Sequence, residues 1–137
     1  MSDIGLILQS IGTTLVTKVA PALEGRYEGG NAGMSGMLAV MAGEAWDSAA
    51  DRLNREIETM RALLMAGGVE ITTQADSLKL TALQAVRNAL ADALITLQAR
   101  IETETDEASK ALNAQIWGFF IAGAAERMPS LPEFPET

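Results

Sequence analysis

The sequence contains neither cysteine nor histidine, and these two absences narrow the chemistry that is open to the protein. Without cysteine there is no disulfide, no thiolate nucleophile and no sulfur-ligated metal site. Without histidine there is no Ser-His-Asp triad, and no imidazole ligand or proton shuttle. Catalysis would depend on carboxylates, hydroxyls, lysine or tyrosine. We therefore expect a protein that is not an enzyme and that uses no cofactor or metal ion.

Basic residues are also scarce, because ten Lys and Arg are outnumbered by eighteen Asp and Glu, giving a formal net charge of -8. Nucleic-acid backbones need a basic surface, so we expect no nucleic-acid partner. The same charge opposes an anionic membrane surface, and no uninterrupted apolar run approaches the roughly 18 residues of a membrane span. Asp3 stands where a secretory signal has basic residues. These features predict a cytoplasmic protein without a membrane partner.

Proline is absent between Pro21 and Pro129. Such a gap, rich in Ala, Leu, Met, Glu and Gln, is typical of long helices, since an interior proline costs about 3 kcal/mol. Apolar periodicity predicts four helices, over residues 3–23, 31–66, 76–102 and 105–128. The expected caps are Ser2 or Asp3, Asn31, Gly67-Gly68, and Thr105 or Asp106.

Within each predicted helix, apolar residues recur at spacings of three and four, which places them on one face. In the first two helices these stripes are Ile4, Leu8, Ile11, Leu15 and Val19, then Met34, Leu38, Met41 and Ala45, continuing through Leu53, Ile57, Met60 and Leu64. We expect these stripes to face the core. The pairs Asp51–Arg55 and Arg52–Glu56 are expected on the exposed face.

Amphipathic helices joined by short loops favour an all-α fold, an antiparallel four-helix bundle. The alternative has three long helices with a kink near residue 104. Residues 1–128 are predicted to form the helical bundle domain, and residues 129–137 a Pro-rich C-terminal tail.

One unusual segment runs from Ala22 to Asn31 and holds the only tyrosine, an arginine and three glycines. Free backbone N–H groups at the start of the next helix, together with Arg26, could hold a phosphate or carboxylate. Arg26, Tyr27 and Asn31 are therefore candidate binding residues. The alternative is a simple helix–helix turn with Tyr27 packed on the end of the bundle.

A second unusual segment, residues 116–125, is apolar nearly all round. Such a helix is either central in a bundle or part of an interface, so Trp117, Phe119 and Phe120 are further candidate binding residues. Gly118 and Ala122 would let another helix approach, which suggests a homodimer or a partner protein. The acidic residues between 102 and 107 lack the spacing of a calcium loop and predict a solvated turn.

Residues 21–26, Asn31-Ala32 and Glu56–Leu64 resemble an uncharacterised bacterial family of small helical proteins. Members of that family are often encoded beside acyl-CoA dehydrogenase-like and aminoglycoside-phosphotransferase-like proteins. The resemblance covers the first half of the chain. It implies an accessory role and names no reaction.

Together these features predict a non-catalytic helical accessory or scaffolding protein that acts through self-association or by binding a partner protein. The alternative is a bundle that binds an acyl or anionic small molecule, with Arg26 at the mouth of the pocket.

Overall fold

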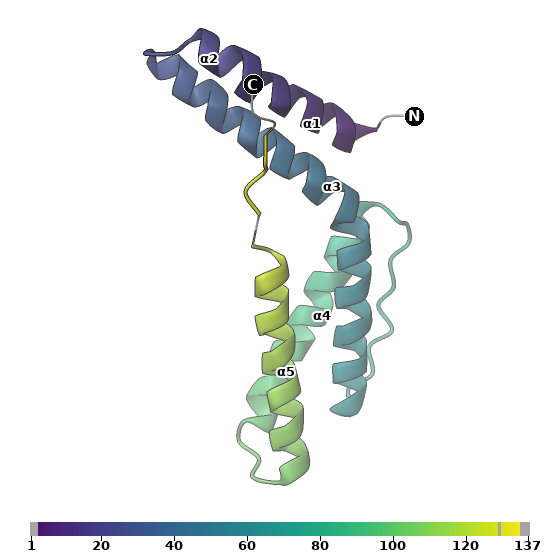
Figure 1. Cartoon of the computed structure of the whole chain (residues 1–137). Helices are drawn as coiled ribbons and strands as arrows, with labels where there is room; N and C mark the ends of the chain where they lie inside the picture. Colours follow the sequence, from purple (N-terminus) through teal and green to yellow (C-terminus); the bar gives the residue numbers. More distant parts are fainter. Residues whose placement is uncertain (1–2, 129, 135–137) are drawn as a thin grey trace. The chain divides into compact units, whose positions relative to one another are not determined.

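The computed structural model describes residues 3–128 and 130–134, and all regular secondary structure in them is helical (Figure 1). The prediction of an all-α protein is confirmed. The elements are α1 (Ile4–Thr14), the π-helical turn η1 (Leu15–Val19), α2 (Ala20–Ala22), α3 (Tyr27–Ala66), α4 (Leu80–Ile101) and α5 (Glu107–Glu126). Contacts divide the chain into two compact units, Met1–Ala49 with Pro129–Thr137, and Ala50–Met128. Helix α3 contributes its first half to one unit and its second half to the other.

In the first unit, α1, η1 and α2 follow one another without a break, as the predicted helix over residues 3–23 requires. Asp3 is its N-cap, although its side chain makes no capping hydrogen bond, and Ser2 lies outside the described residues. The π-turn comes directly before Pro21, where the amide of Ala20 donates to the carbonyl of Leu15. Proline lacks a backbone donor, and a wider turn accommodates that loss before the helix ends.

Helix α3 begins at Tyr27, so the prediction of a loop up to Gly30 with Asn31 as N-cap is wrong. The turn is shorter because Gly25 alone supplies the left-handed conformation, with φ 80°. Gly29 lies within the helix, and a Cβ there would be 2.6 Å from the carbonyl oxygen of Leu23. This glycine thus permits close packing of the turn.

In the first unit, α1 and the first half of α3 lie side by side as a helical hairpin (Figure 1). Glycines from both helices line their contact, together with Leu15, Val16 and Val40. Gly5 lies against Gly43 and Gly12 against Gly36, which is an antiparallel register. A Cβ added at Gly36 would lie 2.7 Å from the carbonyl oxygen of Gly12, so the two backbones are in contact. Glycine interfaces of this kind let helices approach more closely than larger side chains allow.

Several residues of the predicted apolar stripes of the hairpin lie away from the glycine contact. Met34 is exposed and Leu38 is 57% exposed, while Ile11 on α1 is also exposed. The prediction that these three residues face the core is therefore wrong. Leu15, from the same predicted stripe, does reach the contact, where it lies against Gly36.

The second unit has a conventional apolar core built from the second half of α3, α4 and α5. Its most deeply buried side chains are Met60, Leu64, Leu90, Leu94 and Ile116, of which Met60 and Leu64 belong to the stripe predicted for residues 31–66. Burial of such side chains contributes roughly 1.5–3 kcal/mol each. For this part of the chain, the predicted stripes are confirmed.

The second half of α3 and helix α4 run in the same direction, since Glu56 contacts Arg87 and the carbonyl of Gly67 accepts a hydrogen bond from Arg100 at 2.7 Å. The extended connector, residues 69–79, leads the chain from the end of α3 back to the start of α4 (Figure 1). An antiparallel arrangement of all four predicted helices is consequently not confirmed. At the end of α3, Gly68 has φ 73° and the amide of Val69 donates to Leu64, as in a Schellman C-cap.

Helices α4 and α5 are separate, with a turn over residues 102–106 between them, so the alternative of one kinked helix is not observed. Asp106 is the N-cap of α5, and its carboxylate accepts a hydrogen bond from the amide of Ser109 at 3.0 Å. Of the predicted tail over 129–137, residues 130–134 lack regular structure, and 129 and 135–137 lie outside the described residues. The predicted domain boundaries stay a prediction.

Candidate functional site

The outward face of α5 is the most unusual surface of the second unit. Leu112 and Ile116 on its inner face belong to the core. On the opposite side lies an exposed stripe of small and apolar residues, which we call the α5 stripe: Ala111, Ala114, Gly118, Ile121, Ala125 and, just beyond the helix, Met128. No charged residue occurs between Lys110 and Glu126. The outer face of a solvated helix normally carries charge, so this stripe is a candidate contact surface.

The other helices of the same unit follow the usual rule. The outward face of α3 carries Asp51, Arg55 and Glu58, and the outward face of α4 carries Gln84, Asn88 and Asp92. Asp51 and Arg55 form the predicted exposed ion pair at 2.6 Å. Among the three helical segments of the second unit, α5 alone has an outer face that is uncharged along most of its length.

The three aromatic candidates on α5 lie next to the stripe but have different surroundings. Phe119 and Phe120 are half-buried and pack against the core. Trp117 is 53% exposed and meets Phe120 edge to face, with ring centroids 6.5 Å apart. Phe119 and Phe120 therefore fix the rim of the surface, while Trp117 is available to a partner.

The candidates in the first unit are exposed, and they belong to a different unit from the three aromatic residues. Arg26 lies in the turn before α3, and Asn31 lies inside the helix on its surface. Tyr27 is 83% exposed, so it does not pack on a helix end as the simple-turn interpretation expected.

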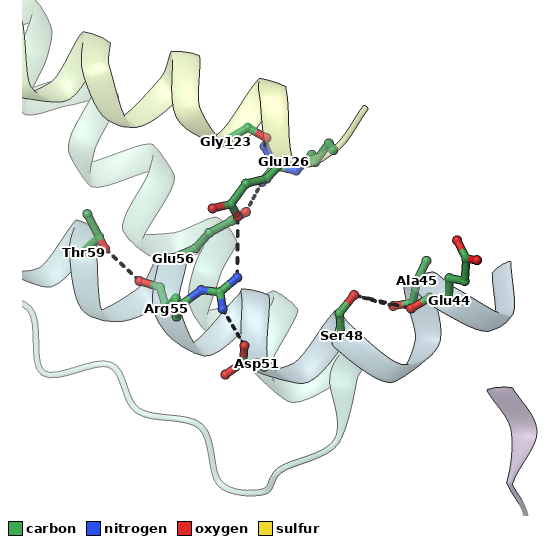
Figure 2. Close-up of polar contacts among 10 residues, drawn as sticks. Glu44, Ala45, Ser48, Asp51, Arg55, Glu56, Thr59, Gly123 and Glu126 are labelled. Carbon is green, nitrogen blue, oxygen red and sulfur yellow. Dashed lines mark hydrogen bonds and ion pairs between the residues drawn. The ribbon is translucent and has the colours of Figure 1, made fainter. Parts of the chain in front are cut away.

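A buried ion cluster in the second unit was not predicted from the sequence (Figure 2). Glu56 is only 6% exposed, and its two carboxylate oxygens accept hydrogen bonds from Arg87 at 2.9 Å and Arg127 at 2.5 Å. The expected exposed pair with Arg52 is wrong. The sequence did contain one indication that Glu56 is buried, because Glu56 falls on the inner face of the helix between Leu53 and Met60.

This cluster joins three elements at one end of the second unit. Arg55 beside it pairs with Asp51 and approaches Glu126 at 3.7 Å (Figure 2). Both oxygens of Glu56 are occupied by guanidinium groups, which neutralise a buried carboxylate that would otherwise be costly. The arrangement fixes the end of α5 against α3 and α4.

The acidic turn between α4 and α5 acts as a helix cap. The backbone N–H of Ser109, followed by its hydroxyl, lowers the pKa of Asp106 below its ordinary value. The hydroxyl of Ser109 also donates to Glu104. Within residues 3–128 and 130–134, no cluster of acidic side chains has a geometry suited to a metal ion.

The hollows in the second unit are open to solvent, and each is either small or lined in part by polar groups. One, of about 240 Å³, lies beneath the extended connector and is lined by Leu64, Met65, Val69 and Ile71, with Arg61 at its edge. Arg61 donates to the carbonyl of Thr73, so its guanidinium is already used to hold the connector. Arg26, the predicted pocket-mouth residue, is in the other unit. Small-molecule binding stays a prediction.

Comparison of the chain with protein-family models, with curated proteins and with solved structures found no match.

Proposed function

We propose that this protein is a non-catalytic helical scaffold that acts by self-association through the α5 stripe. The observation that carries the proposal is the exposed, uncharged outer face of α5, beside two helices whose outer faces are charged or polar. Leaving such a face in water costs free energy, which a protein contact recovers.

The stripe has the spacing of a helix seam, with steps of three and four residues from Ala111 to Met128. It is also self-complementary when two copies run antiparallel. Ala111 then faces Met128 of the second copy, Ala114 faces Ala125, and Gly118 faces Ile121, so that a small residue meets a larger or equal one at each level. Alternating sizes of this kind allow interdigitated packing.

In the same antiparallel register, Trp117 faces Ala122 of the second copy, so a large side chain again meets a small one. A homodimer interface is isologous, so this contact occurs twice, once on each side of the two-fold axis. Partly exposed tryptophan residues are frequent energetic centres of interfaces. The net charge of -8 opposes association of two chains, so we expect the dimer to tighten as salt rises.

The decisive experiment is light scattering on the full chain across a dilution series. We expect a concentration-dependent dimer, and a monomer for Ile121→Glu, because that change places a carboxylate in the centre of the seam. Ile95→Glu is the matched control: Ile95 on α4 is 57% exposed but is not part of the stripe, so this variant should associate like the original.

A monomer at every concentration would overturn the proposal. So would equal loss of association in Ile95→Glu and Ile121→Glu, since that result would reflect added charge in general. Circular dichroism on each variant separates loss of association from loss of folding.

A further inference from the structure

The hairpin of the first unit has its packing inverted relative to a water-soluble helix pair. Glycines bring the two backbones together, with a Cβ at Gly43 placed only 2.6 Å from the carbonyl oxygen of Gly5. Val40, which is 7% exposed, lies against Gly12 and is the only large apolar side chain of the hairpin, within the described residues, that is fully buried. Close backbone packing of small residues is how helices associate where the surroundings are already apolar.

Five large apolar side chains of the hairpin are exposed on its two outer sides. Ile7 follows Gly5 by two residues and Leu38 follows Gly36 by two residues, a rotation of about 200° around each helix. Ile7 consequently points away from α3, and Leu38 points away from α1. The exposed apolar residues are Leu6, Ile7, Ile11, Met34 and Leu38. A single protein surface covers one side of such a pair, whereas lipid surrounds both.

Charge is excluded from the middle of the hairpin. No charged residue occurs between Asp3 and Lys18, or between Glu28 and Glu44. Of the helices in residues 3–128, one alone is apolar enough to cross a membrane: Ile4–Ala22 is 19 residues long, and only 11% of its apolar window is buried. A core helix of a soluble protein would be mostly covered, and this one is not.

The hairpin has two aromatic residues, and they lie at its opposite ends. Tyr27 follows the turn, and Trp46, which is 48% exposed, lies near the open end. Their spacing along α3 corresponds to about 28 Å at 1.5 Å per residue. The hydrocarbon core of a bilayer is about 30 Å thick, and Tyr and Trp are enriched at its two interfaces.

We propose that residues 4–46 insert into the hydrocarbon of a lipid bilayer as an antiparallel helical hairpin, with Tyr27 and Trp46 at the two headgroup levels. This inference does not depend on self-association through α5. It replaces the expectation of no membrane partner, which rested on net charge and on the length of uninterrupted apolar runs. Insertion is driven by apolar area, and the charges of the hairpin lie near its ends, where Lys18 can extend toward water.

The first test uses the full chain synthesised in the presence of zwitterionic phosphatidylcholine vesicles, followed by flotation. We expect the chain to float with the vesicles. Leu38→Asp and Ile7→Asp should each reduce the bound fraction at least ten-fold. Ile95→Asp changes an equally exposed residue on α4 and should bind normally. Ile121→Glu should also bind normally, which separates this inference from the proposed dimer.

The second test measures depth with single-tryptophan chains and lipids that carry a quencher at known positions. Trp117→Phe leaves Trp46 alone. In a chain that carries both Trp117→Phe and Trp46→Phe, either Tyr27→Trp or Leu38→Trp then supplies the only tryptophan. We expect strong quenching by headgroup-level probes at positions 46 and 27, and by acyl-chain-centre probes at position 38.

Three results would overturn the proposal. The chain could stay unbound in flotation. It could bind with all three reporters at headgroup depth, as a helix pair lying on the surface does. Finally, Leu38→Asp could change the mass in solution while vesicle binding is absent, which would assign the outer faces to a second copy of the chain.

Discussion

Both units of this protein have apolar residues at helical spacing, but they differ in which of these residues they bury. In the second unit, apolar stripes face one another and ion pairs such as Asp51–Arg55 lie outside. In the hairpin, glycines face one another and large apolar residues such as Ile7 and Leu38 lie outside. The comparison teaches that a stripe identifies a face of a helix but does not say what covers it. That depends on which face has the smaller residues and on the surroundings of the pair.

The largest expected difference between the units comes from truncating one leucine in each. Leu94 is fully buried, so Leu94→Ala should lower the free energy of unfolding by about 2–5 kcal/mol. Leu38→Ala removes an exposed side chain and should change it by less than about 0.5 kcal/mol in lipid-free buffer. Urea denaturation followed by circular dichroism measures both. If the two losses were equal, the outer face of the hairpin would be covered by protein.

The second prediction tests whether the buried ion cluster stabilises the second unit. Glu56→Gln removes the charge that neutralises Arg87 and Arg127, and should cost about 2–3 kcal/mol, less than for a wholly buried pair because both arginines are partly exposed. Asp51→Asn breaks an exposed pair and should cost about 0.5 kcal/mol or less. The denaturant midpoints of the two variants show how much stability each loses. Similar losses would mean that the buried cluster stabilises the protein no more than an exposed ion pair does.

The helices and the core of the second unit could be predicted from the sequence because both follow from local pattern. Long proline-free stretches, stripes at three- and four-residue spacing, and the Gly67-Gly68 cap each depend on residues close in the chain. The buried contacts of Glu56 could not be found in this way. Its partners Arg87 and Arg127 are far away in sequence, whereas Arg52, one turn away, suggested a plausible but incorrect pair.

The candidate surfaces were predicted only in part, for a related reason. Helix α5 is apolar on both faces, so sequence alone left its aromatic residues as either core or interface. The structure divides them, with Phe119 and Phe120 half-buried and Trp117 exposed. In the hairpin, the role of glycines as a packing surface becomes visible only when Gly12 and Gly36, which are far apart in the sequence, are brought together.

The third prediction compares two glycines on α3, of which Gly36 contacts the neighbouring helix and Gly30 does not. Gly36→Ala places a Cβ 2.7 Å from the Gly12 carbonyl oxygen and from a methyl of Val16, so the helices must separate, at a cost of about 1–3 kcal/mol. Gly30→Ala has open space around it and should stabilise the helix by up to about 1 kcal/mol. Hydrogen exchange read over residues 4–45 should rise in the first variant and fall in the second. Equal changes would mean that the glycines do not define the interface.

The smallest expected effect concerns the helix N-caps, which differ between the units. Asp106 accepts a hydrogen bond from Ser109, whereas Asp3 makes no side-chain cap. Because folding lowers the pKa of Asp106, its contribution to stability is complete above the unfolded pKa of about 3.9 and is lost as pH falls through the lower, folded value. Asp106→Ala should therefore lower Tm slightly at pH 7, and the difference from the original chain should shrink in acid. Asp3→Ala should leave Tm unchanged at both pH values. Asp106→Asn keeps a neutral cap and should lose the pH dependence alone, so a pH-dependent difference that survived in this variant would assign the titration to another group.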